Sequence, residues 1–209
     1  MNSNLKKIRE FFQTKGIDEE TLNMKNPIAL AMQIMHYAHR DQTRENGEGY
    51  ACHPLRCYNM YQDMICASSK RHNVDLLYKH LIPFYGVMEV CLLHDVIEDT
   101  DFTIEDIEEM FVEFGFGEFF NDIMKDALIR ITHNKNVLYD EYIDIVIENP
   151  ISALVKMLDL QDNLTVFDLT KFDEKNFKRA NRYLGYLYKI NNAYHYIEHL
   201  EDYRRELDK

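Results

Sequence analysis

Residues 90–100 carry the side chains whose types and spacing are best suited to chemistry. This stretch begins as an apolar run and then contains His94, Asp95, Glu98 and Asp99. Ionisable groups seldom lie beside such a run unless they are paired or bind a metal. In a helix, His94 and Asp95 leave one turn in neighbouring directions, and Glu98 follows on the same face. The pair offers one nitrogen and one carboxylate ligand, and leaves Glu98 and Asp99 as candidate acid–base groups.

Two more ionisable residues have settings that favour a metal site. His53 precedes Pro54, a residue that favours the first turn of a helix, and Asp159 interrupts an apolar run. Together with His94 and Asp95, they give two imidazoles and two carboxylates from three expected helices. This donor set suits Mn²⁺, Fe²⁺ or Zn²⁺ and leaves positions for water and substrate. Water bound to such an ion loses a proton near neutral pH and can attack phosphorus.

Three segments contain these residues together with characteristic neighbours. Residues 38–54 read AHRDQTRENGEGYACHP, residues 92–100 read LLHDVIEDT and residues 155–163 read VKMLDLQDN. In the same order, they resemble the segments AHxGQxRxxGxPYxxHP, LLHDvvEDT and VKLADxxxN of the RelA/SpoT-type alarmone hydrolases, which are HD-domain metal phosphohydrolases. The similarity covers roughly residues 27–190.

The resemblance implies a role for each matching residue near the metal. Glu98 and Asp99 would activate or orient the attacking water. The family's Mn²⁺ ligands correspond to His53, His94, Asp95 and Asp159.

A local basic wall is expected to meet the substrate, because a formal net charge of −12 repels an anion at long range. The candidates are Arg40, Arg44, Lys156 and Arg179. The resemblance implies that Arg44 contacts the nucleobase and that Asn163 lines the substrate site. The small stand-alone hydrolases of the family direct an Arg and a Tyr, four residues apart, to the phosphates, and Arg179 and Tyr183 have this spacing. We expect Arg44 and Arg179 on opposite sides of the pocket mouth.

The chain departs from the family pattern at a few positions. Gly49 stands where Pro is usual, Asp41 where Gly is common, and Met157–Leu158 where the family has Leu–Ala. None of these changes removes a ligand, whereas the identity of the substrate depends on less specific positions. The 209 residues leave no room for the synthetase and regulatory domains of the long alarmone enzymes, so the resemblance implies a stand-alone hydrolase.

Composition indicates one globular domain, residues 1–209, with its core at about 27–190. Apolar residues make up 46% of the chain and charged residues 29%, and the acidic balance argues against broad nucleic-acid binding. The four cysteines include no CxxC pair, and no apolar run reaches the ~20 residues of a membrane span. We expect a cytoplasmic protein with reduced thiols, no signal peptide, no membrane partner and a small nucleotide as substrate.

Apolar residues recur at helical spacing along the chain, and no alternating strand pattern is strong. We expect an all-α fold, a single HD-domain helical bundle. Asn26–Pro27 and Asn149–Pro150 are typical of helix boundaries. A connection with a short helix is expected at 69–83. The expected helices span 4–15, 27–44, 54–68, 84–98, 103–114, 118–131, 139–148, 151–164 and 174 into the 190s.

The leading hypothesis is a Mn²⁺-dependent phosphohydrolase that removes the 3′-pyrophosphate from guanosine tetra- or pentaphosphate. One alternative keeps the metal and changes the substrate to the 2′-phosphate of NADPH or to a nucleoside monophosphate. Another is a nucleotide-binding regulator with little turnover, and a third is a structural helical partner. Simpler interpretations also exist for single residues: a surface pair for His94–Asp95, a solvated helix-end cation for Arg44, and an exposed helix pair for Arg179 and Tyr183.

Overall fold

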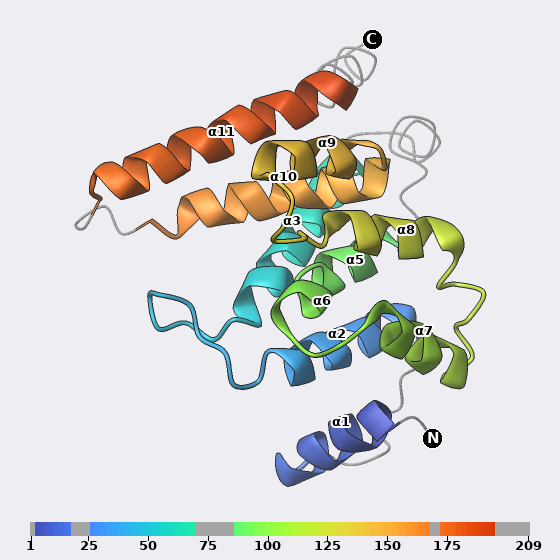
Figure 1. The fold of residues 1–209 in the computed structure, drawn as a ribbon. Coiled ribbons are helices and arrows are strands. Elements are labelled where there is room, and N and C mark those ends of the chain that lie inside the picture. The colour runs from blue at the N-terminus through green and yellow to red at the C-terminus, as the bar shows by residue number, and fades with distance from the viewer. Residues whose placement is uncertain (1–2, 18–25, 70–85, 168–171, 195–209) are drawn as a thin grey trace.

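The computed structural model describes residues 3–17, 26–69, 86–167 and 172–194, and within them it confirms the all-α fold (Figure 1). The short helix expected between residues 69 and 83 falls almost wholly on residues outside this part. The helices are α1 (Ser3–Thr14), α2 (Pro27–Ala38), α3 (Cys52–Ser69), α5 (Val87–Leu93), α6 (Val96–Asp99), α7 (Ile104–Glu113), α8 (Asp122–Ile131), α9 (Tyr139–Ile147), α10 (Pro150–Thr165) and α11 (Glu174–Tyr194).

The two expected Asn–Pro boundaries are confirmed as helix starts. Asn26 accepts a hydrogen bond from the backbone N–H of Ala29 at 2.8 Å, and Pro27 opens α2. Asn149 likewise caps α10 through the backbone N–H groups of Ile151 and Ser152. Each side-chain oxygen satisfies a donor that the first helical turn leaves unpaired.

The expected extension of α2 to Arg44 is wrong. The helix ends at Ala38, with His39 as its C-cap. Beyond it, the backbone N–H of Arg44 donates to the carbonyl of Glu48 at 2.8 Å, and Gly47 has a positive φ of 83°. This tight turn needs a left-handed residue at Gly47, which a continuing helix would not allow. The chain from 39 to 51 is therefore a loop that returns to the body of the protein.

The expected helix over 84–98 is divided at His94 and Asp95. The structure has α5 before this pair and the single turn α6 after it. The break places Asp95 and Asp99 so that both reach the hydroxyl of Tyr50, while His94 remains buried. The helix expected from residue 118 also begins later, at Asp122, where Asn121 supplies the cap.

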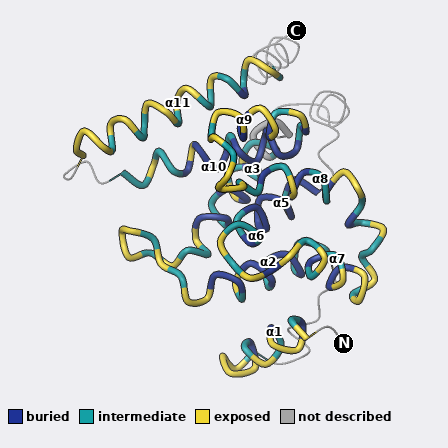
Figure 2. The backbone as a smooth tube through the Cα atoms, in the orientation of Figure 1, coloured by how far each residue is buried: buried dark blue, intermediate teal, exposed yellow. Residues whose placement is uncertain are grey.

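Helix α5 lies at the centre of the fold and contacts α2, α3, α8 and α10 (Figure 2). Its residues are buried except for Met88, as a core element requires. A second buried cluster joins α9, α10 and α11 through Tyr142, Leu160 and Ile190. These contacts hold α3, the α5–α6 junction and α10 in fixed positions around one site. Among the described helices, none is long and apolar enough to span a bilayer.

Candidate active site

The four predicted metal ligands meet where α3, the α5–α6 junction and α10 converge. His53 Nε2 lies 3.0 Å from Asp159 Oδ1 and 3.5 Å from Asp95 Oδ2. His94 Nε2 lies 3.2 Å from the same oxygen of Asp95. Residues separated by about 100 positions in sequence thus bring two imidazole nitrogens and two carboxylate oxygens close together.

The tautomers of both histidines leave Nε2 available to a cation. His94 Nδ1 lies 2.8 Å from the carbonyl of Cys91, and a carbonyl only accepts, so Nδ1 carries the proton. His94 Nε2 is buried and has no hydrogen-bond partner in the described part of the chain. His53 Nδ1 lies 2.6 Å from Asp162 Oδ2, which fixes its proton in the same way. A carboxylate or carbonyl behind a histidine is the usual support of a metal-binding imidazole.

The electrostatics of the site favour a positive charge at its centre. Burial disfavours a charged His53, yet hydrogen bonds to Asp159 and Asp162 outweigh it and raise the pKa of His53 to about 12. A proton on Nε2 thus takes the position that a bound cation would occupy, and the cation would have to displace it. Burial also disfavours a charged Asp159, but Lys156 and His53 hold the pKa of that carboxyl well below its usual range. Asp159 is therefore ionised. Burial would also raise the pKa of Asp95, but His94 and His53 outweigh burial and lower it, so Asp95 is ionised as well. The donor set and its negative charge fit a divalent cation.

Cys57 belongs to another possible ligand group, because suitable atoms of His53, Cys57 and His94 lie within 4.8 Å of one another. However, Cys57 Sγ lies 4.0 Å from His53 Nδ1, the nitrogen that binds Asp162. Burial also raises the pKa of the Cys57 thiol to about 11. The thiol therefore stays protonated at neutral pH, and a protonated thiol is a weaker metal ligand than a thiolate. Asp95 and Asp159 therefore remain the predicted ligands in preference to Cys57.

Asp162 contacts His53 on the side of the ring away from the other predicted metal ligands, and sequence analysis gave it no role. It is 1% exposed and accepts hydrogen bonds from Arg56 Nε at 2.6 Å and from Arg44 at 3.1 Å. Burial would raise the pKa of Asp162, but His53 and Arg56 outweigh burial and hold it below its usual range. The signal was the helical spacing, because Asp162 follows Asp159 by one turn.

Lys156 was expected to meet the substrate, and the structure places its ammonium inside the site. The Nζ atom lies 2.8 Å from Asp159 Oδ2 and 5.2 Å from the centre of the Tyr142 ring. Burial would lower the pKa of Lys156, but Asp159 outweighs burial and raises it. The lysine thus holds the second oxygen of Asp159, a predicted metal ligand, and its contact with substrate stays a prediction.

The candidate acid–base residues lie on α6, next to the predicted metal site. Glu98 Oε2 accepts a hydrogen bond from the backbone N–H of His133 at 2.9 Å, and burial raises the pKa of Glu98. The hydroxyl of Tyr50 lies 2.8 Å from Asp99 Oδ2 and 2.9 Å from Asp95 Oδ2. A hydroxyl has one proton, so Tyr50 can donate to only one of these carboxylates at a time. This tyrosine was not identified from the sequence.

A pocket of about 330 Å³ adjoins the ligands and brings the other predicted substrate residues together. Asn163 connects it to the metal site, because its Nδ2 donates to Asp159 Oδ1 at 2.5 Å. Arg44 donates to the amide oxygen of Asn163, and the Arg179 guanidinium lies over the Phe167 ring at 4.7 Å. The pocket is lined by Thr43, Arg44, Glu45, Asn46, Tyr50, Asn163, Val166, Arg179 and Tyr183.

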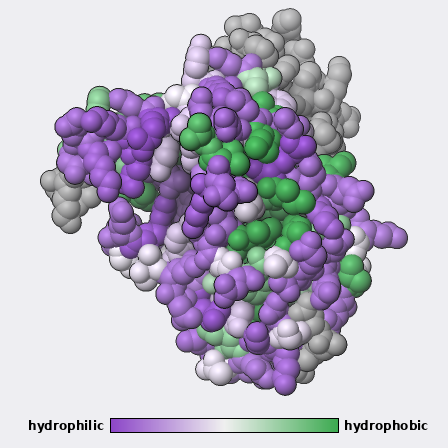
Figure 3. Space-filling model, in the orientation of Figure 1, coloured by the Kyte–Doolittle hydropathy of each residue, from purple (hydrophilic) through white to green (hydrophobic). Residues whose placement is uncertain are grey.

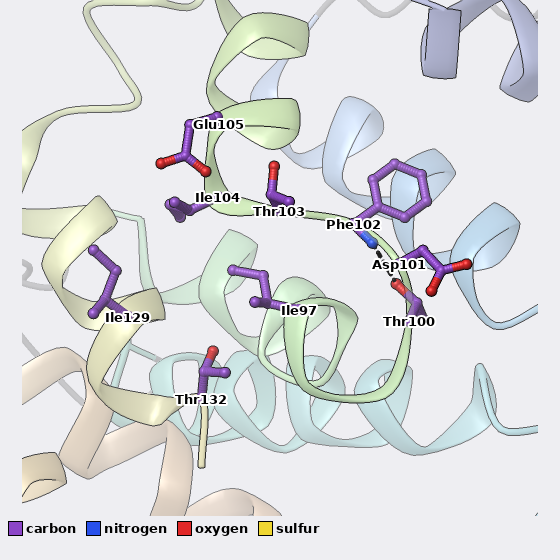
Figure 4. A pocket seen from close by; sticks show the side chains of 9 residues that line it. All are labelled: Ile97, Thr100, Asp101, Phe102, Thr103, Ile104, Glu105, Ile129 and Thr132. Atoms are coloured by element: carbon purple, nitrogen blue, oxygen red, sulfur yellow. Dashed lines mark hydrogen bonds between the residues drawn. The ribbon is translucent and has the colours of Figure 1, made fainter. Parts of the chain in front are cut away.

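A second pocket, of about 460 Å³, lies between α6, α7 and α8 (Figure 4). Ile97, Ile104 and Ile129 face it, and hydrophobic residues gather over this part of the surface (Figure 3). Ile97 adjoins Glu98 in the chain, but none of the predicted site residues lines this pocket. The predicted metal ligands and the predicted substrate contacts are thus associated with the smaller pocket.

Comparisons with known proteins agree with the resemblance found in the sequence. No family model matches the chain. A protein of Aquifex aeolicus named guanosine-3′,5′-bis(diphosphate) 3′-pyrophosphohydrolase is 29% identical over 137 residues, which are 66% of this chain and 17% of that protein. A Vibrio cholerae protein of the same name is 26% identical over 79% of this chain and 22% of its own length. The chain thus spans about a fifth of the length of these bacterial relatives.

Two animal proteins are similar over a larger part of their own length. A Drosophila melanogaster guanosine-3′,5′-bis(diphosphate) 3′-pyrophosphohydrolase is 28% identical over 66% of this chain and 69% of that protein. A solved structure described as a metazoan orthologue of SpoT that hydrolyses ppGpp superposes with a TM-score of 0.57 and 22% identity, and covers 87% of this chain and 96% of its own. The chain therefore has the HD-domain helical fold of that structure, and its resemblance to the RelA/SpoT-type alarmone hydrolases is confirmed.

Proposed function

We propose that this chain is a divalent-metal-dependent phosphohydrolase, and specifically a guanosine-3′,5′-bis(diphosphate) 3′-pyrophosphohydrolase. The observation that carries the proposal is the convergence of His53, His94, Asp95 and Asp159 beside a pocket that contains the predicted substrate residues. The relatives named above act, by name, on the same nucleotide. Residues 1–209 act in this proposal as one HD-type domain with its catalytic core at about 27–190. The free thiols of Cys52, Cys57 and Cys91 support a cytoplasmic location.

Mn²⁺ is the metal that we propose for the four ligands, since two imidazole nitrogens and two carboxylate oxygens suit it. When bound, such an ion lowers the pKa of a coordinated water and polarises the phosphoryl oxygen. The protein positions the ligands for this purpose: Asp162 orients His53, and Lys156 holds Asp159. These supports keep the imidazole and the carboxylate in one geometry while the substrate changes.

The substrate residues divide into base and phosphate contacts. The terminal nitrogens of Arg44 are taken by Asp162 and Asn163, so the flat face of the guanidinium is what Arg44 offers to a nucleobase. Arg179 Nε is buried and has no hydrogen-bond partner among the described residues, which leaves a donor for phosphate oxygens. Tyr183 lines the same pocket one helical turn later, where its hydroxyl can add a second donor.

Hydrolysis requires a water oxygen to bond to phosphorus and the bond from phosphorus to the 3′-oxygen to break. Glu98 accepts the proton of the attacking water, a role that its raised pKa suits because acid–base groups act best near the working pH. A proton must then reach the departing 3′-oxygen, and Asp99 is the group assigned to deliver or orient it. The products are pyrophosphate and a guanosine nucleotide with a free 3′-hydroxyl.

The test is a product-release screen of the purified protein loaded with Mn²⁺. The panel contains guanosine tetraphosphate, NADPH and nucleoside 5′-monophosphates, and released pyrophosphate and orthophosphate are measured separately. We expect pyrophosphate from guanosine tetraphosphate. If orthophosphate is released from NADPH and nothing is released from guanosine tetraphosphate, NADPH is the substrate instead. If nucleotides bind without any release, the protein is a nucleotide-binding regulator.

A further inference from the structure

His39 is buried beside the candidate active site, and none of the roles described so far involves it. It is the C-cap of α2 and is 2% exposed. Its ring lies 4.8 Å from the ring of Tyr50, at an interplanar angle of 31°. Tyr50 in turn contacts Asp95 and Asp99 through its hydroxyl. His39 thus packs directly behind the residues that link the metal ligands to the acid–base pair.

The hydrogen bonds of Gln42 fix the tautomer of His39. Gln42 Nε2 donates to the backbone carbonyl of Asp99 at 2.7 Å, which orients the amide. Its Oε1 then faces His39 Nδ1 at 2.7 Å and can only accept, so Nδ1 carries the proton. Burial also lowers the pKa of His39, which favours the neutral ring. Nε2 therefore bears a lone pair.

Among the described residues, none donates to that lone pair. In the described part of the chain, His39 Nε2 is buried without a hydrogen-bond partner. The charged groups that face the ring are the carboxylates of Asp95 and Asp99 and the imidazole of His94. Ionised carboxylates are acceptors and cannot satisfy a second acceptor. Buried polar atoms are almost always paired, so this acceptor is placed for a donor that comes from outside the protein.

We propose that His39 is a positioning residue whose Nε2 accepts a hydrogen bond from the attacking water. This inference rests on the proposed phosphohydrolase function. One proton of the water goes to Glu98, while the other stays on oxygen and points at His39. A water held by two acceptors presents its remaining lone pair in one direction, which reduces the misaligned orientations that lower the rate. Gln42 bonds both His39 and the backbone carbonyl of Asp99, and so fixes the position of the His39 ring relative to α6.

The alternative that His39 is a further metal ligand makes a different prediction. A ligand contributes to metal affinity, whereas a residue that orients water contributes to turnover. A purely structural histidine would affect neither measurement without also changing thermal stability. Metal affinity, turnover and stability therefore separate the three roles.

The experiment compares His39→Asn with His39→Gln and with the exposed His36→Asn on the same helix as a control. The Asn amide stands in for Nδ1 and keeps a donor for Gln42, but it has no atom at the place of Nε2. We expect His39→Asn to bind Mn²⁺ with wild-type affinity in titration calorimetry, and to lower kcat for guanosine tetraphosphate about tenfold to a hundredfold with little change in KM. His39→Gln, whose longer amide reaches the place of Nε2, should recover part of the loss, and His36→Asn should match the wild type.

A readout without substrate keeps this test separate from the choice of nucleotide. Water-proton relaxation of the Mn²⁺-loaded protein reports how its bound water exchanges, and we expect it to change in His39→Asn and not in His36→Asn. Wild-type kcat together with wild-type relaxation would overturn the proposal, and so would a large loss of Mn²⁺ affinity. Should His39→Asn fail to fold, Gln42→Leu decides, because it frees the tautomer and leaves the ring: wild-type kcat in that variant overturns the proposal. If the wild type does not hydrolyse guanosine tetraphosphate but the relaxation changes in His39→Asn, the proposed substrate is wrong and the proposed role of His39 stands.

Discussion

His53 Nδ1 lies 2.6 Å from Asp162 Oδ2, on the side of the imidazole away from the other ligand atoms. The same carboxylate binds Arg56 and Arg44, so one buried group supports a proposed metal ligand and one side of the proposed substrate pocket. A change at Asp162 should thus affect both metal and substrate. This combined effect distinguishes a supporting carboxylate from a metal ligand, because the loss of a ligand mainly lowers metal affinity.

Asp162→Asn should lower Mn²⁺ affinity about tenfold to a hundredfold, the usual cost of losing an outer carboxylate behind a metal-binding histidine. The amide oxygen can still accept from His53 Nδ1, but the negative charge that balances Arg44 and Arg56 is gone. Titration calorimetry measures the affinity, and circular dichroism verifies the fold. The exposed Asp63 on α3 supplies the control, Asp63→Asn. Equal affinities in both variants would show that Asp162 does not support the metal site.

Glu98→Gln should retain metal and fold and lose most turnover. The amide oxygen preserves the hydrogen bond from the backbone N–H of His133, which Glu98→Ala would remove. Proton transfer is lost in both variants, and such groups contribute on the order of 10²–10⁴ in rate. Single-turnover kinetics with guanosine tetraphosphate measures the loss. A Glu98→Gln enzyme with the wild-type rate would exclude this glutamate as the base.

Arg44 and Arg179 should have separable effects, although both line one pocket. Arg44→Ala should weaken discrimination between guanine and adenine nucleotides, because the flat guanidinium no longer meets the base. It should also lower Mn²⁺ affinity somewhat, since Arg44 binds Asp162. Arg179→Ala should raise the Michaelis constant for every polyphosphate alike.

The control for this pair is Arg182→Ala, on the exposed face of α11. Steady-state kinetics with guanine and adenine polyphosphates gives kcat and KM for each variant. The same change in both constants for Arg44→Ala and Arg179→Ala would refute the division into base and phosphate contacts.

The sequence predicted the candidate site residues better than it predicted the helix boundaries around them. His94 and Asp159 were conspicuous because a charge inside an apolar helix has a high cost unless something compensates it. The loop from 39 to 51 was not predictable from periodicity, because residues before Gly47 fit a helix as well as a turn. Asp162 and Arg56 were missed because their role depends on which helices become neighbours. Helical spacing places Asp162 on the same face as Asp159, but it does not show which residues of α3 that face meets.

Ile129→Asn should leave kcat and KM at wild-type values. Ile129 is 52% exposed on α8 and lines the larger pocket, which contains none of the predicted ligands or substrate contacts. An exposed substitution of this kind typically changes stability by no more than about 0.5 kcal/mol. Steady-state kinetics and thermal unfolding measure both quantities. A rise in KM of more than about tenfold, equivalent to about 1.4 kcal/mol, would place substrate in the larger pocket instead.

Glu89 should make the fold less stable as the pH rises towards neutrality. It is 4% exposed on α5, and burial raises the pKa of Glu89 from 4.5 to about 7. Between these two values, the folded state keeps a proton that the unfolded state has released. The free energy of unfolding therefore falls as pH increases through this window, and is constant beyond it. The total loss is about 3.5 kcal/mol at most, because one unit of pKa difference corresponds to about 1.4 kcal/mol.

Glu89→Gln removes the titrating group and should be more stable than the wild type at pH 8 but not at pH 4.5. Tyr58 and Tyr61 of α3 face Glu89, and their raised pKa values keep both hydroxyls neutral throughout the window. Other titrating groups contribute equally to both proteins, so the difference between the two unfolding curves isolates Glu89. Urea unfolding at intervals between pH 4 and 8 measures it. A difference that does not grow with pH would show that Glu89 is ionised in the folded protein and is balanced by a cation.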